Sequence, residues 1–534
     1  MQTIEKEKEK LKRLFNVIAQ LVSIALKYDG SYASMKSIYG FEENSKSVKE
    51  ALSNIWNQGI ESFLNYCENE QNSLLESINS DTADLGKCVV ISVAIIQFID
   101  EKITYNEKIY RKEEDSNGND LIFASILFDK TPGLYWKIDH LNSDESLENT
   151  GIWVNPKLDS KFTVDDRISG KPRPLTNRNS LFHINAILKH MRFFPTSYNV
   201  TVKNIVLKSF KARNESSLRV GFGPLCCWNK ELFKTESVKV CDRGFEKKGF
   251  RINKIIREEE LIHRFQKDLW HAARKDIDIL FFPEMLGTDG MIDEKYGFSR
   301  FWRNTAYEMN KDGLTPPRFL VFPSLWKNRS NIAYSCLSNG MILGGFRKTV
   351  PYIHHVKEQG KESYLQEDLE EQNQTELFIV HIPDKGCLSA MICAQFLADD
   401  KRNNADVLFS CLGVDLLLVI SFSPGERDFV NKLEKFKEYG VSVVWGNCCE
   451  AIKTDGNNKK TGIIGAVSVS GTQGISTFGE KASHNCGFHC SSNDSCLFII
   501  DLPLIIPWNK PEIIKVEDIV NVSHSLIKAD LEGS

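Results

Sequence analysis

The clearest structural signal in this chain is NIAYSCLSNGMILGGFRK, residues 331–348. Its two apolar runs are separated by Asn339-Gly340, and an Asn-Gly pair in that position favours a tight β-hairpin turn, because both residues tolerate a positive φ. We therefore expect two paired strands here, with Lys348 directly after the second.

Short apolar runs that predict further strands lie on both sides of this hairpin. They are residues 218–222, 277–282, 319–322, 377–382, 388–392, 416–421 and 441–445. A helix is expected between the first two, because Leu261, Phe265 and Leu269 recur on one helical face. Strands that alternate with helices predict an α/β domain with buried sheets.

Three of the predicted strands are followed by a residue with useful chemistry. Glu284 follows residues 277–282, Lys348 follows the hairpin, and Cys393 follows residues 388–392. Such positions lie at the rim of a rigid sheet, where functional side chains are commonly placed. A carboxylate, an ammonium and a thiol would supply a general base, an oxyanion stabiliser and a nucleophile. This set predicts attack on a carbon–nitrogen bond.

The order Glu284, Lys348, Cys393 and the residues around them resemble the nitrilase (carbon–nitrogen hydrolase) superfamily. The resemblance runs from residue 218 to about residue 505 and is strongest in the hairpin. It implies a four-layer α-β-β-α sandwich with no metal or organic cofactor. It also implies that Cys393 is the nucleophile, Glu284 the general base and Lys348 the stabiliser of the tetrahedral intermediate.

The resemblance further implies hydrolysis of a non-peptide carbon–nitrogen bond through a thioester on Cys393. We expect an amide substrate in preference to a nitrile, because amide-cleaving branches are the more numerous in the family. The alternative is a catalytically inactive nitrilase-like scaffold or a ligand-sensing regulatory protein, since such domains also occur fused to other modules in prokaryotic defence proteins. The family's tendency to assemble implies a homo-oligomer.

Many members of the family carry a second glutamate after the lysine, where it helps to position the lysine and the substrate. Residues 350–376 are expected to form a long acidic loop with Glu358, Glu362 and Glu367 as alternatives, of which we favour Glu358. The family also tends to place an aromatic and then an acidic residue after the nucleophile. Ala394-Gln395 stands there in this chain, which implies an unusual substrate pocket.

Residues 1–215 lie outside the resemblance and are expected to form a mixed, helix-first domain of unknown function. Apolar residues recur at helical spacing over 11–25, and a capping-box pattern at Ser47 predicts a second helix. Residues 88–99 fit either a buried helix or a core strand. Predicted strands follow at 121–128, 134–138 and 152–154. The nitrilase-like domain is expected over 216–505, with a C-terminal tail at 506–534.

The composition is that of a globular, slightly acidic protein. Of the 534 residues, 42% are hydrophobic and 26% are charged, which predicts two or more domains. The net charge of -4 gives no general electrostatic reason to bind nucleic acid.

The most apolar runs are shorter than the roughly 18 residues of a membrane-spanning helix, and the N-terminus lacks the apolar core of a secretory signal. We therefore expect a cytoplasmic protein with 14 free cysteines, a small-molecule substrate and an N-terminal domain able to bind a protein partner.

Two further patterns resemble metal sites, and neither is favoured. The first is a cluster of soft ligands, namely His484, Cys486, His489, Cys490 and Cys496. Its spacing does not match the common paired zinc pattern, so a thiol-rich loop is preferred. The second is Asp399-Asp400, which lacks the following strand that a two-metal site would need.

Overall fold

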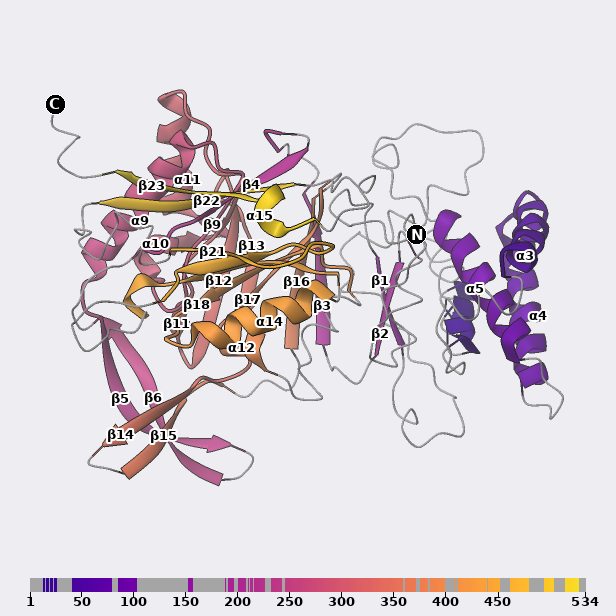
Figure 1. Ribbon diagram of the computed structural model, residues 1–534, viewed down its shortest axis with the longest axis horizontal. Coiled ribbons are helices and arrows are strands. Elements are labelled where there is room, and N and C mark those ends of the chain that lie inside the picture. Colours follow the sequence, from indigo (N-terminus) through magenta and orange to yellow (C-terminus); the bar gives the residue numbers. More distant parts are fainter. Residues whose placement is uncertain are drawn as a thin grey trace.

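The structure, a computed structural model, describes most of the chain from residue 210 onward and parts of the preceding region. The described residues are 13–25 without 15, 19 and 23, then 41–78, 85–102, 152–156, 188, 191–195, 200–207 and 210–527, the last without 211, 215, 226–231, 243–244, 359–360, 371–374, 383–384, 399–408, 410–411, 439, 452–461, 480–493 and 504–513. Figure 1 shows helices in the N-terminal region and a larger body built on sheets. The protein is thus a mixed α/β structure with several sheets.

The described N-terminal region is mainly helical. Its helices are α3 (Phe41–Trp56), α4 (Ile60–Ile78) and α5 (Leu85–Lys102), and the described residues within 13–25 are helical as well. Residues 88–99, which fitted a helix or a strand, belong to α5, and their lack of a polar face reflects burial along most of that helix. The helix predicted to open at Ser47 begins earlier, at Phe41. None of the helices in the described ranges is both long and apolar enough to cross a membrane.

A small antiparallel sheet follows these helices. It pairs β1 (Ile152–Pro156) with β2 (Met191–Pro195). The Asp100 carboxylate of α5 accepts the Met191 backbone N–H at 2.8 Å, which joins α5 to this sheet. The strand predicted at 152–154 lies in β1, whereas residues 121–128 and 134–138 lie outside the described residues.

The first large sheet carries the predicted hairpin. Its strands are β4 (Ser217–Phe222), β7 (Ile279–Phe281), β10 (Phe319–Val321), β11 (Leu325–Lys327), β12 (Ser330–Leu337), β13 (Ile342–Arg347), β22 (Ser495–Pro503) and β23 (Asn521–Ile527). Their order is β11-β12-β10-β7-β4-β22-β23, with β13 also paired to β12. The antiparallel pairing of β12 with β13 confirms the hairpin, and Gly340 has the positive φ, 86°, that its turn requires.

The second large sheet carries the strand that precedes Cys393. It contains β3 (Val200–Val206), β16 (Thr375–Ile382), β17 (Gly386–Ile392), β18 (Leu416–Ser421), β19 (Ser442–Asn447), β20 (Gly465–Ser468) and β21 (Ser476–Phe478), in the order β21-β20-β19-β18-β17-β16-β3. The sheets extend beyond the boundaries drawn from the sequence. Strand β3 precedes residue 216 and pairs with β16, and β23 follows residue 505 and pairs with β22.

Side chains alternate along the strands between two hydrophobic cores. Ile279 and Phe281 of β7 lie in the core shared with the second sheet, whereas Leu280 between them packs with the apolar face of α9 (Glu258–Arg274). The two sheets pack closely where Phe222 of β4 meets Gly446 of β19. A Cβ added at Gly446 would lie 2.4 Å from the Phe222 ring.

Helices cover both large sheets. On the first sheet, α9 and α11 (Arg300–Lys311) share a core with the strands, and on the second sheet α14 (Glu426–Glu438) packs on β19 and β20 beside α12 (Ala394–Leu397). The remaining described elements are short: α10 (Asp289–Ile292), α15 (Val516–Ile519), the 3-10 helix η3 (Cys449–Ala451), β8 (Glu294–Lys295) and β9 (Phe298–Ser299).

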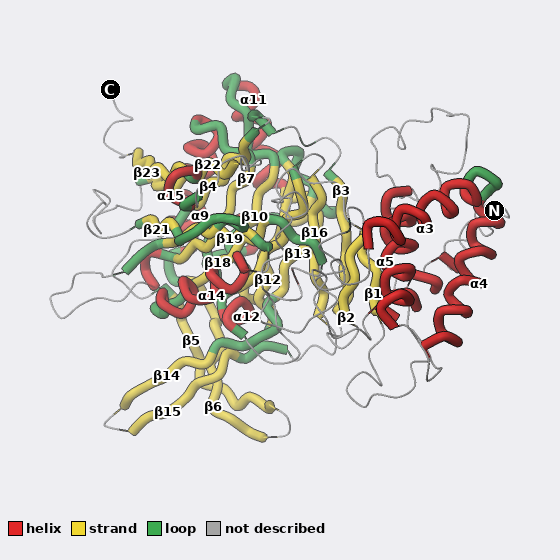
Figure 2. Tube along the Cα trace, turned by 45° about the vertical axis from the view of Figure 1, so that its right-hand side comes forward, coloured by secondary structure: helices red, strands yellow, loops and turns green. Residues whose placement is uncertain are grey.

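A four-stranded sheet projects from this body as an arm (Figures 1 and 2). It contains β5 (Phe233–Asp242), β6 (Phe245–Ile255), β14 (Ile353–Glu358) and β15 (Lys361–Glu367), in the order β14-β15-β6-β5. The region 350–376, which we expected to be a loop, therefore holds a hairpin. Acidic residues do not prevent strand formation when one face is solvated, and Ile353 and Tyr364 supply β-prone side chains.

The contact between Phe222 and Gly446 provides a test of how the sheets pack. Gly446→Ala should destabilise the protein by about 1–3 kcal/mol, because the new methyl group overpacks the interface. Adding Phe222→Leu should recover part of that loss. Chemical denaturation of the two single variants and the double variant gives their free energies of unfolding. These should show a favourable coupling energy between the two positions of at least about 0.5 kcal/mol. Strictly additive losses would mean that the two residues do not meet.

Candidate active site

The structure brings Glu284, Lys348 and Cys393 together at one rim of the two sheets. Glu284 lies just past β7, Lys348 follows β13 and Cys393 follows β17. The Lys348 Nζ lies 2.6 Å from Glu284 Oε1, and the Cys393 thiol is hydrogen-bonded to the Glu284 side chain. All three residues are buried, with exposed fractions of 0% for Glu284 and 2% for each of the others.

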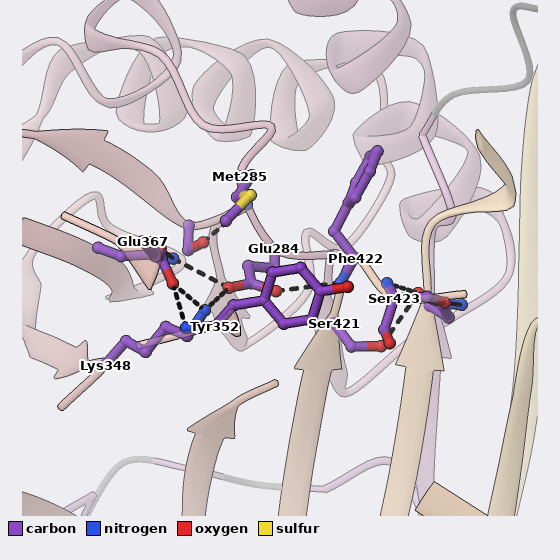
Figure 3. Close-up of polar contacts among 11 residues, drawn as sticks. Glu284, Met285, Lys348, Tyr352, Glu367, Ser421, Phe422 and Ser423 are labelled. Atoms are coloured by element: carbon purple, nitrogen blue, oxygen red, sulfur yellow. Dashed lines mark hydrogen bonds and ion pairs between the residues drawn. The ribbon is translucent and has the colours of Figure 1, made fainter. Parts of the chain in front are cut away.

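A second carboxylate completes the cluster. Glu367, the last residue of β15, places Oε2 at 2.6 Å from Lys348 Nζ, so the ammonium lies between two carboxylates (Figure 3). Glu358, the position that we favoured from the sequence, lies opposite Lys361 in the backbone register at the other end of the β14–β15 hairpin. The signal that would have selected Glu367 is the one that selected the other three residues, namely a position at the end of a strand.

Asn331 connects the two carboxylates. Its Nδ2 donates to Glu284 Oε1 at 3.0 Å and reaches Glu367 Oε1 at 3.5 Å. Asn331 is held opposite Lys348 by the hairpin, since the Lys348 backbone N–H donates to the Asn331 carbonyl at 2.9 Å. The Tyr352 N–H also donates to Glu367 Oε2 at 2.9 Å. These donors satisfy carboxylate oxygens that water cannot reach.

Two arginines hold the segment that carries Glu367. The next residue, Asp368, is buried, and its carboxylate accepts from Arg251 Nη2 at 2.5 Å and from Arg329 Nε at 2.9 Å. Arg251 comes from β6 of the arm, and Arg329 lies beside the predicted hairpin. Strand β15 is thus fixed at the end where it delivers Glu367.

Burial and charge pairing set the protonation states in the cluster. Burial raises the pKa of Glu284, the Lys348 charge lowers it and the Glu367 charge raises it, with a net upward shift. Burial opposes the ammonium of Lys348, but attraction to Glu284 and Glu367 outweighs it and raises the Lys348 pKa. Burial and the neighbouring Glu284 raise the pKa of the Cys393 thiol well above its usual range. Lys348 is therefore charged, and Cys393 rests as a thiol next to a carboxylate of raised basicity.

Cys393 occupies a sharp turn between a strand and a helix. Its φ of 44° and ψ of -110° lie in a region that non-glycine residues rarely adopt, and such strain is found mainly at functional sites. The Cys393 N–H donates to the Ile420 carbonyl at 2.8 Å, which secures the turn to β18. The Phe422 backbone N–H donates to Glu284 Oε2 at 3.1 Å and to the Cys393 sulfur. Ala394 and Gln395 begin α12 directly after the thiol.

The two patterns that resemble metal sites lie mostly outside the described residues. This applies to His484, Cys486, His489, Cys490 and the pair Asp399-Asp400. Cys496 is described, and its sulfur lies 3.2 Å from His524 Nε2. Within the described ranges, no group of three His, Cys, Asp or Glu side chains is arranged to hold a metal ion.

Comparison with known proteins finds similarity to solved structures alone. No family model and no curated protein matches the chain. The chain is similar to an amidase from Nesterenkonia sp. (13% identity, 56% of this chain and 95% of that one, TM-score 0.31), which belongs to the nitrilase superfamily. It is also similar to the C. elegans NitFhit protein (12% identity, 54% and 79%, TM-score 0.30) and to glutamine-dependent NAD+ synthetase from Acinetobacter baumannii (15% identity, 54% and 45%, TM-score 0.30).

Removal of the central ammonium should make stability depend strongly on pH. Lys348→Met leaves two buried carboxylates without a cation, which should cost about 3–5 kcal/mol at neutral pH. Because the pKa of Glu284 is raised in the folded state, ionising it destabilises the fold as pH rises through that pKa. The free energy of unfolding that Lys348→Met loses relative to the wild type should therefore become smaller as pH falls from 8 toward 5. Chemical denaturation of both proteins across that range measures it.

The matched control for this experiment is Lys327→Met, which removes an exposed lysine paired with the exposed Asp289. It should change stability by less than about 1 kcal/mol and show little dependence on pH. The buried cluster would be contradicted if Lys348→Met lost as little free energy of unfolding as Lys327→Met, or if its loss were equally independent of pH.

Proposed function

We propose that the two large sheets and their covering helices form a nitrilase-type four-layer α-β-β-α sandwich that hydrolyses a non-peptide carbon–nitrogen bond. Cys393 is the nucleophile, Glu284 the general base and Lys348 the stabiliser of the developing negative charge. The observation that carries this proposal is the buried ammonium held at 2.6 Å from each of two carboxylates, with a thiol hydrogen-bonded to one of them.

The energetic cost of this cluster favours a catalytic role over a structural one. Well-packed apolar side chains of similar volume often stabilise a protein as well as a buried ion pair does, because charges lose their hydration on burial. Perturbed pKa values that arise from burial together with specific charge partners are characteristic of active sites. The strained backbone at Cys393 supports the same conclusion, since its neighbours must hold it against its own preference.

The proposed reaction begins with transfer of the Cys393 proton to Glu284. The sulfur attacks the amide carbonyl carbon, and the carbonyl π electrons move to oxygen, where Lys348 and a backbone N–H stabilise the negative charge. Glu284 returns the proton to the nitrogen as the C–N bond breaks, so that ammonia or an amine leaves and a thioester remains. Glu284 then takes a proton from water, and the hydroxide attacks the thioester carbonyl carbon. The C–S bond breaks, the carboxylic acid leaves, and Glu284 returns the proton to the Cys393 sulfur.

Glu367 and Asn331 have supporting roles in this proposal. Glu367 takes the place that we assigned to a second glutamate, because it contacts Lys348 and keeps the ammonium charged and directed toward Glu284. Asn331 donates to the Glu284 oxygen that also contacts Lys348, which orients the other oxygen toward the Phe422 N–H. An amide substrate is favoured over a nitrile.

Selective alkylation tests whether Cys393 is activated. Brief treatment with substoichiometric iodoacetamide, followed by peptide mass spectrometry, should label Cys393 at least about tenfold faster than Cys336. Cys336 is a suitable internal reference because burial raises its pKa as it does that of Cys393, but Cys336 lacks a carboxylate partner in its described surroundings. Glu284→Gln should reduce labelling of Cys393 to the rate of Cys336, since the base is lost. Equal rates for both thiols in the wild-type protein would favour the inactive scaffold.

A pair of glutamate variants tests the choice between the two positions in the arm. Glu367→Gln should lower amide hydrolysis, followed as ammonia release from a panel of short amides, by about 10²-fold or more, because Lys348 loses a charged partner. Glu358→Gln makes the same chemical change at the far end of the same hairpin and should keep wild-type activity. A larger loss in the Glu358 variant would restore the choice made from sequence.

A further inference from the structure

The loop at residues 421–423 presents a backbone donor to both reacting groups of the site. This loop joins β18 to α14, and its Phe422 N–H donates to Glu284 Oε2 at 3.1 Å and to the Cys393 sulfur. Loops are usually the most variable part of a fold. A donor in a loop can act on both groups reproducibly only if the loop is held in one conformation.

Asn447 supplies that restraint from the end of the neighbouring strand. Its Oδ1 accepts the Ser423 N–H at 3.0 Å and the Ser421 hydroxyl at 3.0 Å, and its Nδ2 donates to the Ser423 carbonyl at 2.7 Å. The side chain thus bridges both backbone groups of Ser423, one residue beyond the donor. Strand register explains the contact, because Asn447 pairs with Ser421 as the last residues of β19 and β18.

An aromatic stack joins the same strand to the nucleophile. The Trp445 Nε1–H donates to the Ser421 hydroxyl at 2.8 Å. The Trp445 ring stacks on Phe429 of α14 with centroids 4.8 Å apart, and Phe429 stacks on Phe396 of α12 at 6.0 Å. Phe396 lies three residues after Cys393, and its N–H donates to the Cys393 carbonyl at 2.9 Å. Strand β19 therefore contacts the loop directly and reaches α12, the helix after the thiol, through Phe429 of α14.

We propose that Asn447 is a positioning residue, which holds the 421–423 loop so that the Phe422 N–H remains on Glu284 and Cys393 throughout the reaction. This inference rests on the proposed function. Asn447 touches neither the thiol nor Glu284 in the described contacts, so it acts through the loop. The hydrogen bond from Phe422 lowers the pKa of the thiol and favours its ionised form, and that effect should be lost when the loop is released.

The test is the pH dependence of Cys393 alkylation in Asn447→Leu, which keeps similar volume and removes all the side-chain hydrogen bonds. We expect the iodoacetamide rate at neutral pH to fall about tenfold and the midpoint of the rate profile to move upward by about one pH unit. The matched control is Ser468→Ala on the adjacent strand β20, which removes a buried hydroxyl bond to the Leu433 carbonyl of α14. It should leave the profile in place, because loss of stability alone does not shift the pKa of a thiol.

The outcomes separate this inference from the function on which it rests. If wild-type Cys393 reacts no faster than Cys336, both the function and the inference are overturned. If wild-type Cys393 is activated and Asn447→Leu has the wild-type profile, the inference alone is overturned. Should Asn447→Leu fail to fold, Asn447→Ser replaces it, since a serine hydroxyl is too short to bridge both groups of Ser423, and the same upward shift is expected.

Discussion

The ammonium of Lys348 lies between the carboxylates of Glu284 and Glu367 without contact with water, and the surrounding strands must end where that cluster can form. A buried charge that loses its partner destabilises a protein strongly, so none of the three positions can move independently. Glu284 and Lys348 follow two strands of the first sheet, whereas Glu367 comes from the arm. The arm is therefore a structural part of the site, and Asp368 fastens it there through Arg251 and Arg329.

Close packing of the two sheets brings the thiol to this cluster. Cys393 follows β17 in the second sheet, while Glu284 and Lys348 follow strands of the first. The absence of a side chain at Gly446 lets Phe222 lie directly against β19, and β19 in turn ends at Asn447. The distance between the sheets, the conformation of the 421–423 loop and the geometry around Cys393 thus depend on one another. This connection explains why so many described side chains near the thiol belong to strand ends.

Local patterns in the sequence predicted much of this arrangement, and the parts they missed depend on long-range pairing. Asn339-Gly340 predicted its hairpin because the turn is encoded in two residues, and short apolar runs located Glu284, Lys348 and Cys393 at strand ends. Glu367 was one of three alternatives and Glu358 was preferred to it, because a solvated, charged hairpin resembles a loop in sequence. Strands β3 and β23 join the large sheets from outside the expected boundaries, and neither pairing leaves a local signature. The contact between Asn447 and Ser423 likewise follows from register, which one sequence does not display.

The most direct test of the account is to look for the covalent intermediate. The protein would be mixed with a panel of primary amides, quenched in acid during turnover and digested for mass spectrometry. The account predicts that the peptide containing Cys393 gains the mass of the acyl group with at least one amide, and that Glu284→Gln shows no such adduct. Ammonia release with an acyl group on another residue, or no adduct on Cys393 with any amide, would contradict it.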